Sequence, residues 1–256
     1  MKIGVTGCTG RVGSLITKEL LSGDWKELEL AGGTVLNEDE IADNFFMTTN
    51  AEELFTRADA VIDFTSPKAV STHTQLAAKY KTILVIGTSG LSEADETLIM
   101  QASQKAPIVY AANMSIGVNL LIALVQQAAR RLDESWDAEI LDLHHKYKVD
   151  APSGTSYALA KAVQKGRDKA FDKSDLTLAR EGHTGPRKTG TIGFSVQRGG
   201  DVVAENSTIF FGMGERLEIT HKATDRAIFA RGALRAALWA KDQPAGLYSM
   251  NDVLGL

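Results

Sequence analysis

The sequence predicts an α/β protein with two domains, an N-terminal parallel sheet covered by helices and a smaller α+β domain with a mixed or antiparallel sheet. Short apolar strands alternate with helix-compatible stretches as far as Tyr110, a pattern typical of parallel sheets. Beyond Asn113 the pattern changes, and the last three strand-like segments, between residues 191 and 221, are separated only by glycine-bearing turns. Because 44% of the 256 residues are hydrophobic, the chain can bury a sizeable core.

The first domain begins with an apolar strand, Lys2–Thr6. A helix follows, in which the apolar residues Val12, Leu15 and Leu20 recur at helical spacing. Further strands are expected at residues 28–31, 60–64, 82–86 and 108–110, and helices at 68–80 and 93–105.

The second domain is expected to begin with a helix at 118–132 that is apolar on nearly every side, which indicates burial between layers. A strand at 138–143 and a helix at 155–165 follow. Three segments, 191–197, 202–211 and 215–221, predict an antiparallel meander, and a last helix at 226–241 is expected to pack back on the first domain. The predicted domains are therefore 1–115 with 225–256, and 116–224.

Charge and composition argue against several classes of protein. Lys and Arg number 28 against 32 Asp and Glu, without a long basic run, so binding to nucleic acid or to a membrane surface is not expected. The first residues do not resemble a signal peptide, and no apolar run approaches the ~18 residues of a membrane span. A single cysteine, Cys8, cannot form an internal disulfide, which fits the reducing cytoplasm.

A glycine-bearing turn joins the first strand to the first helix. It reads G-x-x-G-x-x-G over Gly7, Cys8, Thr9, Gly10, Arg11, Val12 and Gly13. Backbone amides at the positive end of a helix can face a pyrophosphate there, and glycine permits the close approach. A structural βα turn is the alternative, but the position within a βαβ pattern favours a Rossmann dinucleotide-binding domain.

Loops after two later strands support a cofactor site. Residues 63–67 and 87–90 lie at the edge where open α/β sheets bind ligands, although either could be an ordinary turn. The second strand should end in an acid for an adenosine ribose or an arginine for a 2′-phosphate, but Thr34 and Val35 stand there. Arg11 could favour NADPH, yet a pyrophosphate contact or a solvated side chain is the simpler interpretation, so NADH or NADPH stays open.

The highest concentration of titratable side chains in the sequence follows the strand at 138–143. If the backbone stays extended, His144 and Lys148 lie on one face and His145 on the other. Two potential proton donors, His144 and Lys148, would then line the same side of a site.

A helix start follows this segment. Pro152 suits the first turn of the next helix, which places Ser153, Gly154 and Thr155 at its N-terminus. Amides and a threonine hydroxyl there form a cradle for a carboxylate, and a cationic Lys148 adds attraction for an anionic substrate.

Simpler interpretations compete for each titratable group. Adjacent histidines on a strand point apart and no H-E-x-x-H motif occurs, so no metal site is expected. His144 could be a hydrogen-bonded structural histidine, residues 146–148 a solvated loop and Asp150 a helix cap. Of the remaining histidines, His73 is expected at the surface and His221 in a strand. His183 is expected to be either exposed or near the substrate.

From His144 to Thr155 the chain reads H-H-x-x-K-x-D-A-P-S-G-T, and this segment resembles the signature of the 4-hydroxy-tetrahydrodipicolinate reductase family, also called dihydrodipicolinate reductases, of the diaminopimelate route to lysine. The resemblance extends to the following further segments: 7–13, 61–65, 87–90, 111–115, 117–119, 190–194 and 215–223. It therefore spans nearly the whole length.

The resemblance implies roles for individual residues. His144 would exchange a proton, Lys148 would donate one, and His145, Gly154 and Thr155 would bind substrate. Residues implied to contact the dinucleotide are Gly7, Cys8, Thr9, Gly10, Arg11, Val12, Gly87, Thr88, Ser89, Ala111, Ala112, Asn113 and Met114. The family usually has phenylalanine in place of Met114 and an acid near Thr34, and Arg226 resembles a substrate-side arginine less securely.

The resemblance also implies an activity and an assembly. A cyclic dicarboxylate would lose water and accept hydride from NADH or NADPH, giving tetrahydrodipicolinate, with the first domain binding the dinucleotide and the second the substrate. Closure near Ser115 and Arg226 would bring them together, and the second-domain sheet would form a homotetramer.

Two other hypotheses remain open from the residues. One is a two-domain dehydrogenase acting on a different small carbonyl or imine acid. The other is a cofactor-binding sensor without turnover, which the intact run from His144 to Thr155 disfavours.

Overall fold

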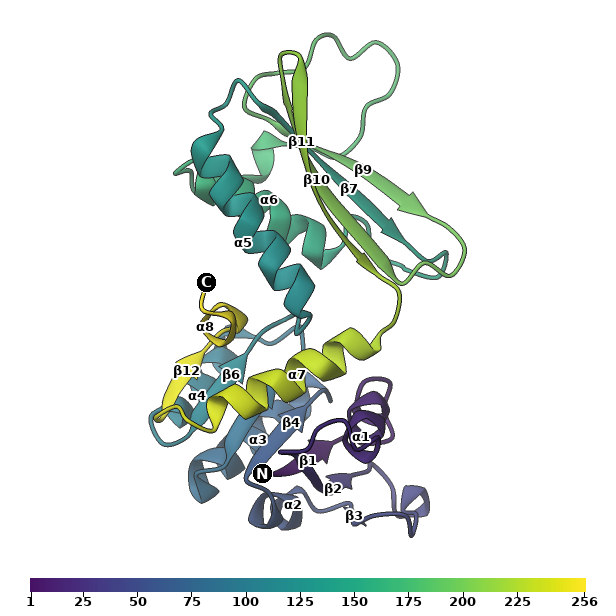
Figure 1. Cartoon of the computed structure of the whole chain (residues 1–256), viewed down its shortest axis with the longest axis vertical. Helices are drawn as coiled ribbons and strands as arrows, with labels where there is room; N and C mark the ends of the chain where they lie inside the picture. Colours follow the sequence, from purple (N-terminus) through teal and green to yellow (C-terminus); the bar gives the residue numbers. More distant parts are fainter. The chain divides into compact units, whose positions relative to one another are not determined.

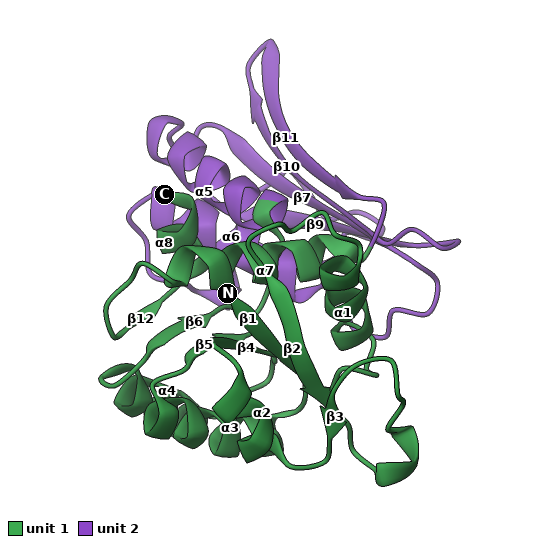
Figure 2. Cartoon of the chain, turned by 60° about the horizontal axis from the view of Figure 1, so that its bottom comes forward, with its two compact units in different colours: residues 1–116, 226–256 green, residues 117–225 purple.

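The computed structural model describes all 256 residues, which form two compact units (Figure 2). Unit 1 comprises Met1–Ile116 and Arg226–Leu256, and unit 2 comprises Gly117–Asp225. The boundaries expected after residues 115 and 224 each lie one residue away from this division. The binding roles expected of the two units stay predictions.

Unit 1 contains a parallel sheet of seven strands in the order β12-β6-β5-β4-β1-β2-β3 (Figure 1). The strands are β1 (Lys2–Thr6), β2 (Glu29–Thr34), β3 (Met47–Thr48), β4 (Ala60–Asp63), β5 (Ile83–Ile86), β6 (Pro107–Tyr110) and β12 (Gly246–Tyr248). Chain order reverses on either side of β1, where β2 pairs with one edge and β4 with the other. Such a switch point opens a crevice at the carboxyl ends of these strands, which is where ligands of open α/β sheets bind.

Helices cover both faces of this sheet. They are α1 (Gly13–Leu21), α2 (Ala51–Arg57), α3 (Pro67–Tyr80), α4 (Glu93–Ser103), α7 (Ala227–Ala240) and α8 (Met250–Leu254). Successive residues of β4 point to opposite faces, so Ile62 joins one apolar core with Leu234 of α7 while Val61 joins another with Phe55 and Ile99. The expectation that the last long helix packs on the first domain is confirmed, because α7 belongs to unit 1.

Unit 2 contains a mixed sheet of five strands in the order β11-β10-β7-β9-β8. The strands are β7 (Asp137–His144), β8 (Leu176–Thr177), β9 (Ile192–Arg198), β10 (Ala204–Gly212) and β11 (Glu215–Ala223). Helices α5 (Ile116–Arg131) and α6 (Gly154–Gly166) lie along one face of it (Figure 1). Their core with the sheet is centred on Leu121, Val125, Ile140 and Phe210.

The predicted antiparallel meander is wrong in one pairing. Strands β10 and β11 form the expected hairpin, but β7 lies between β9 and β10, parallel to the first and antiparallel to the second. The connection at residues 199–203 therefore spans two interstrand spacings of about 4.8 Å each rather than one. Its glycines resemble those of a tight hairpin, although the loop is long enough to cross β7.

Helix α5 differs from the expectation of burial on nearly every side. Val118, Leu121 and Val125 are buried, whereas Leu120 and Leu124 are 42% and 41% exposed in the single chain. The helix packs on the sheet through one face, and the apolar residues of the other face do not enter that core. No helix of the structure, including this one, is long and apolar enough to cross a membrane.

Candidate active site

The turn between β1 and α1 has the geometry that its glycines predict. Gly7 has a positive φ of 64°, a conformation that glycine adopts without strain, and its carbonyl accepts a hydrogen bond from the amide of Gly10 at 2.9 Å. A Cβ on Gly13 would collide with that same carbonyl. Helix α1 begins without a side-chain cap, so no capping side chain competes with an anion there, although the amide of Ser14 donates to the carbonyl of Gly10 at 2.9 Å.

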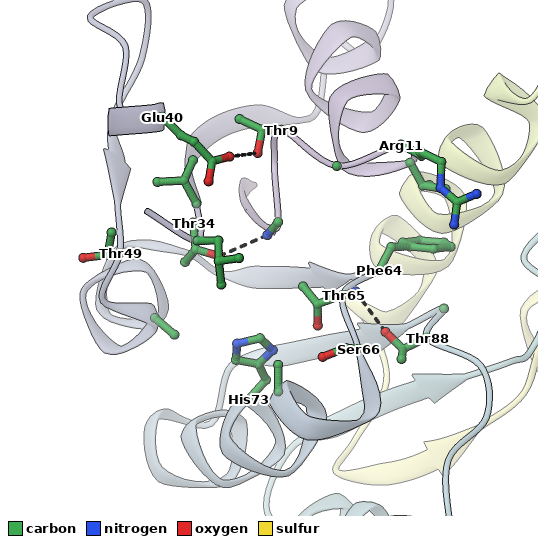
Figure 3. Close-up of a pocket in the computed structure, with 18 of the residues that line it drawn as sticks. Thr9, Arg11, Thr34, Glu40, Thr49, Phe64, Thr65, Ser66, His73 and Thr88 are labelled. Carbon is green, nitrogen blue, oxygen red and sulfur yellow. Dashed lines mark hydrogen bonds between the residues drawn. The ribbon is translucent and has the colours of Figure 1, made fainter. Parts of the chain in front are cut away.

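This turn opens into a cavity of about 790 Å³ at the carboxyl ends of β1, β2, β4 and β5 (Figure 3). The expected cofactor residues that line it are Gly7, Thr9, Gly10, Arg11, Val12, Gly87, Thr88 and Ser89. Others that line it include Thr34, Glu40, Phe64, Thr65, His73 and Phe229. Two loops far apart in sequence thus meet the glycine turn around one space.

Five of the expected cofactor residues do not line this cavity. Cys8 is only 3% exposed and packs against Gly33 in the core, where burial raises the pKa of its thiol. Ala111 and Ala112 come directly after β6 and do not line the cavity. In the same segment the side chain of Asn113 accepts a hydrogen bond from the amide of Ser115 at 2.9 Å, and Met114 is buried in the core. Their role toward a dinucleotide stays a prediction.

The prediction that His73 lies at the surface is wrong. His73 is 6% exposed, and its Nδ1 lies 2.6 Å from Oδ2 of the fully buried Asp63. Helix α3 is polar in composition, but Val70, His73 and Ala77 share the face that packs on the sheet. Composition does not identify that face, whereas the spacing of these residues does.

Asp63 ties both loops of the cavity to this histidine. Its Oδ1 accepts hydrogen bonds from the amide of Thr65 at 2.9 Å and from the hydroxyl of Thr88 at 3.1 Å. Burial would raise the pKa of this carboxyl, but the hydrogen bond from His73 and those from Thr65 outweigh it and lower the pKa. An ionised carboxylate therefore fixes the ends of β4 and β5 against each other.

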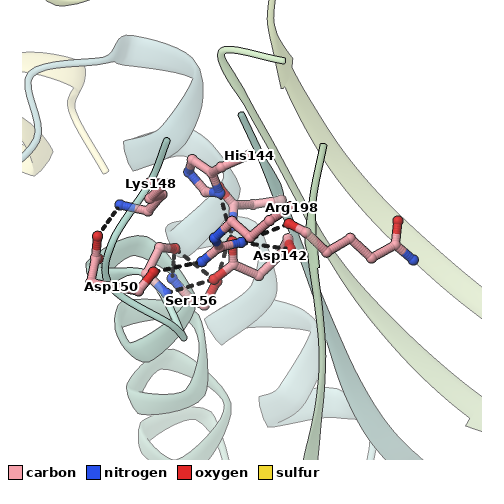
Figure 4. A network of polar contacts seen from close by, with 9 residues as sticks. Asp142, His144, Lys148, Asp150, Ser156 and Arg198 are labelled. Carbon is pink, nitrogen blue, oxygen red and sulfur yellow. Dashed lines mark hydrogen bonds and ion pairs between the residues drawn. The ribbon is translucent and has the colours of Figure 1, made fainter. Parts of the chain in front are cut away.

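A second acid–histidine pair lies in unit 2, at the carboxyl end of β7 (Figure 4). Residues of β7 alternate between half-buried and buried, and the buried set continues from Ala138 and Ile140 to Asp142 and His144. Oδ1 of Asp142 lies 2.6 Å from Nδ1 of His144. The buried face of this strand is apolar at its beginning and ends in two buried ionisable side chains.

Asp142 is held from several directions. Its Oδ2 accepts the amide of Ser153 at 2.5 Å, and its Oδ1 accepts Nη1 of Arg198, on β9, at 3.1 Å. Burial acts to raise the pKa of this carboxyl, but the hydrogen bonds from His144, Ser153 and Arg198 hold it far below its usual range. Asp142 is therefore an anion at neutral pH, beside the histidine.

Lys148 does not continue the strand, so the condition of an extended backbone from His144 to Lys148 is not met. Strand β7 ends at His144, and the amide of Lys148 donates to the carbonyl of His145 at 3.1 Å across a tight turn. Nζ of Lys148 lies 2.7 Å from Oδ1 of Asp150, whose carbonyl accepts Nη2 of Arg198 at 2.7 Å. Figure 4 shows Lys148 and His144 on the same side of this network. The turn brings them there without the alternation of a strand.

Helix α6 starts two residues after Pro152, not at it. Ser153 caps the helix by accepting the amide of Ser156 at 3.2 Å, so Asp150 is not the cap. Pro152 is buried, while Gly154 is exposed and Thr155 half-buried in the first turn. The predicted substrate residues Gly154 and Thr155 therefore stand at a helix N-terminus, where the helix dipole favours an anion.

The other histidines and the loop before β9 have simple positions. His145 is half-buried with its ring 6.5 Å from that of Tyr147, His183 is exposed, and His221 lies in β11 as expected. Arg180, in the loop before β9, donates from Nη2 to Glu139 of β7 at 2.7 Å. The structure brings no group of three or more His, Cys, Asp or Glu side chains together as metal ligands.

Asp142, Arg198 and Glu40 are the site residues that sequence reasoning missed. Asp142 stands two positions before His144, and that period-two spacing was the signal for it. Arg198 comes from a strand paired with β7 far along the chain, which no local pattern reveals.

Unit 1 is a parallel sheet with helices on both faces and a glycine turn at its switch point, and unit 2 carries a buried acid–histidine pair. Together these features define a two-domain oxidoreductase that binds a nicotinamide dinucleotide. The family model described as "Dihydrodipicolinate reductase, N-terminus" matches residues 1–114, and that described as "Dihydrodipicolinate reductase, C-terminus" matches residues 117–254. The chain belongs to the dihydrodipicolinate reductase family, which confirms the resemblance seen at His144 to Thr155.

Known relatives are similar over their whole length. The 4-hydroxy-tetrahydrodipicolinate reductase of Agrobacterium fabrum is 47% identical over 271 residues, covering 100% of this chain and 97% of the relative. That of Rhizobium rhizogenes is 46% identical over 268 residues, with the same coverage of 100% and 97%. The solved dipicolinate-bound dihydrodipicolinate reductase from Paenisporosarcina sp. TG-14 is 22% identical, covers 97% of both chains and has a TM-score of 0.79, a likeness of fold.

Proposed function

We propose that this protein reduces 4-hydroxy-tetrahydrodipicolinate to tetrahydrodipicolinate with NADH or NADPH, in the diaminopimelate route to lysine. The name of its full-length relatives supports this reaction. The observation that carries the proposal is the Asp142–His144 pair, set beside Lys148 and the N-terminus of α6. This arrangement offers proton exchange and anion binding within one small region, as a reacting dicarboxylate requires.

His144 exchanges a proton with the substrate in this proposal. Its Nδ1 is engaged by Asp142 at 2.6 Å, so Nε2 is the nitrogen through which the ring reaches substrate. The Asp142 carboxylate sets the orientation of the ring. Acid–base help of this kind contributes roughly 10² to 10⁴ in rate.

Lys148 supplies a second proton and positive charge. Its side chain is only 21% exposed, and its ammonium group is held by Asp150, which stands at the surface. An incoming carboxylate competes with Asp150 for this ammonium, so substrate binding can release Lys148 toward the reacting carbon skeleton. His145, Gly154 and Thr155 bind the carboxylates, since a helix N-terminus attracts anions.

The cavity of unit 1 fits a nicotinamide dinucleotide. Its glycine turn leaves no room for a Cβ on Gly13, and α1 begins without a side-chain cap, as an anion-binding helix start requires. Gly7 to Val12 would hold the pyrophosphate, and Gly87 to Ser89 the nicotinamide ribose. The bound cofactor supplies a hydride to the substrate. Hydride transfer requires that cofactor and substrate meet, so closure about Ser115 and Arg226 belongs to the proposal.

The assembly proposed is a homotetramer formed through the sheet of unit 2. Strand β11 is an edge strand of nine residues, and an exposed edge invites pairing with another chain. Phe211 and Leu217 of the β10–β11 hairpin are 38% and 41% exposed, and Met213 at its tip is fully exposed. Light scattering coupled to size-exclusion chromatography tests this, because a monomer at micromolar concentration would contradict it.

The proposed location is the cytoplasm. The only cysteine, Cys8, is buried in unit 1 and has no second cysteine with which to form an internal disulfide, which fits a reducing compartment. Fractionation of the source cells tests this, because recovery outside the cytoplasmic fraction would contradict it.

Optical measurement of NADH or NADPH oxidation tests the proposed reaction. The substrate is made fresh by condensing aspartate semialdehyde with pyruvate, and consumption of the reduced nicotinamide is followed after the protein is added. Turnover with at least one cofactor is expected. Cofactor binding without turnover would support the sensor hypothesis, whereas turnover only with other carbonyl or imine acids would support a dehydrogenase of different specificity.

A further inference from the structure

The adenosine side of the cofactor cavity is closed by the end of β2. Thr34 lines the cavity, its hydroxyl accepts the amide of Gly7 at 3.0 Å, and its carbonyl accepts the amide of Cys8 at 2.9 Å. The end of the second strand is where a dinucleotide-binding domain presents the group that recognises the adenosine ribose. In this chain the position holds Thr34 and Val35, which carry no charge.

A carboxylate reaches the same place from a later segment. Glu40 ends the short 3₁₀ helix η1 (Glu38–Glu40) and lines the cavity. Its Oε2 accepts the hydroxyl of Thr9 at 2.7 Å, and its Oε1 accepts the amide of Asn37 at 3.1 Å. One oxygen is thus tied to the glycine turn and the other to the chain that leaves β2.

The position of Glu40 sets the charge at this end of the cavity. Figure 3 shows Glu40 with Thr9 on one side of the space, and Arg11 beside Phe64 on another. Arg11 is the only lysine or arginine among the lining residues, so no cation stands next to Glu40 there. The hydrogen bond from Thr9 lowers the pKa of Glu40, which keeps the side chain ionised at neutral pH.

Ribose and phosphorylated ribose make opposite demands on such a group. A carboxylate accepts hydrogen bonds from the 2′- and 3′-hydroxyls of an adenosine ribose. It repels a 2′-phosphate, which needs arginine or lysine in its place. We propose that Glu40 is the specificity-determining residue of the cofactor site and makes NADH the preferred cofactor over NADPH. This inference rests on the proposed nicotinamide-dependent function.

Direct binding of NADH and of NADPH tests the assignment without relying on turnover. Nucleotide fluorescence is titrated with the full-length protein and with Glu40→Gln, which keeps the shape of the side chain but removes its charge. The unsubstituted protein is expected to bind NADH at least about tenfold more tightly than NADPH, because like charges placed together penalise binding strongly. Glu40→Gln is expected to reduce the ratio of NADH affinity to NADPH affinity at least about fivefold, mainly because NADPH binds more tightly.

Glu38→Gln is the matched control, since Glu38 is an exposed acid of the same short helix and does not line the cavity. It is expected to leave the ratio unchanged. Equal affinity for both nucleotides, a ratio unaltered in Glu40→Gln, or the same change in Glu38→Gln would overturn the role of Glu40 alone. If the unsubstituted protein bound neither nucleotide, the proposed function itself would fail.

Discussion

The carboxylate of Asp142 and the imidazole of His144 are two residues apart on β7 and 2.6 Å apart in space, with the carboxylate fully buried. Because alternate residues of a strand share a face, the backbone itself aligns the acid behind the ring. Arg198 donates to the same oxygen of the acid as the histidine, and the amide of Ser153 donates to the other oxygen. The histidine is therefore positioned by a group that has no freedom to move away.

Replacing this acid is expected to lower turnover through the orientation of His144. Asp142→Asn keeps the shape, but its amide nitrogen cannot accept hydrogen bonds from partners that now donate to the carboxylate. We expect kcat to fall at least about tenfold, with NADH affinity unchanged. Asp201→Asn, an exposed acid in the loop after β9, serves as control. A shift of the acid limb of the pH–rate profile together with the loss in kcat would separate positioning of His144 from a purely structural role.

Acid should destabilise the protein through the same carboxylate. The pKa of Asp142 is lower in the folded protein than in the unfolded chain, so its ionised form stabilises the fold above a pH of about 4. That contribution is lost as the pH falls through the folded-state pKa. Thermal unfolding of Asp142→Asn should therefore depend less steeply on pH below about 4 than that of the unsubstituted protein. Parallel profiles for the two proteins would contradict this.

Lys148 is expected to matter for chemistry and not for cofactor binding. We expect Lys148→Ala to reduce turnover at least about 100-fold with little change in NADH affinity. Lys146→Ala is the matched control, because Lys146 is an exposed lysine of the same turn. Steady-state kinetics and nucleotide titration on both variants provide the measurement, and near-normal turnover of Lys148→Ala would remove the lysine from the mechanism.

Asp63 is expected to control cofactor affinity from beneath the cavity. Asp63→Asn removes the anion that holds Thr65, Thr88 and His73, and we expect NADH affinity to fall at least about fivefold because the loops lose their fixed positions. Asp59→Asn disrupts a hydrogen bond from Lys2 at the opposite end of β4. That control should change stability without changing affinity, and an equal loss of affinity in both variants would assign Asp63 a merely structural role.

Local patterns in the sequence predicted the strands near the glycine turn and the segment from His144 to Thr155, because both depend on neighbours along the chain. The pairing of β7 with β9 and β10 could not be predicted, because it joins residues that are far apart in the sequence. In addition, the glycines of the loop at 199–203 resemble those of a hairpin turn between neighbouring strands. The position of Glu40 could not be predicted for the same reason: its contact with Thr9 joins two residues that are far apart in the sequence. The burial of His73 depended on which face of a polar helix meets the sheet.

Helix α7 has a consequence for the order in which the protein is made. Ala230, Leu234 and Ala237 belong to the core of unit 1 together with Ile3 and Ile62, yet they follow the whole of unit 2 along the chain. On the ribosome, residues 117–225 are complete before α7 has been synthesised. The nascent protein must therefore keep part of one apolar face of its first sheet, over β4, β5 and β6, uncovered until translation has delivered its last long helix.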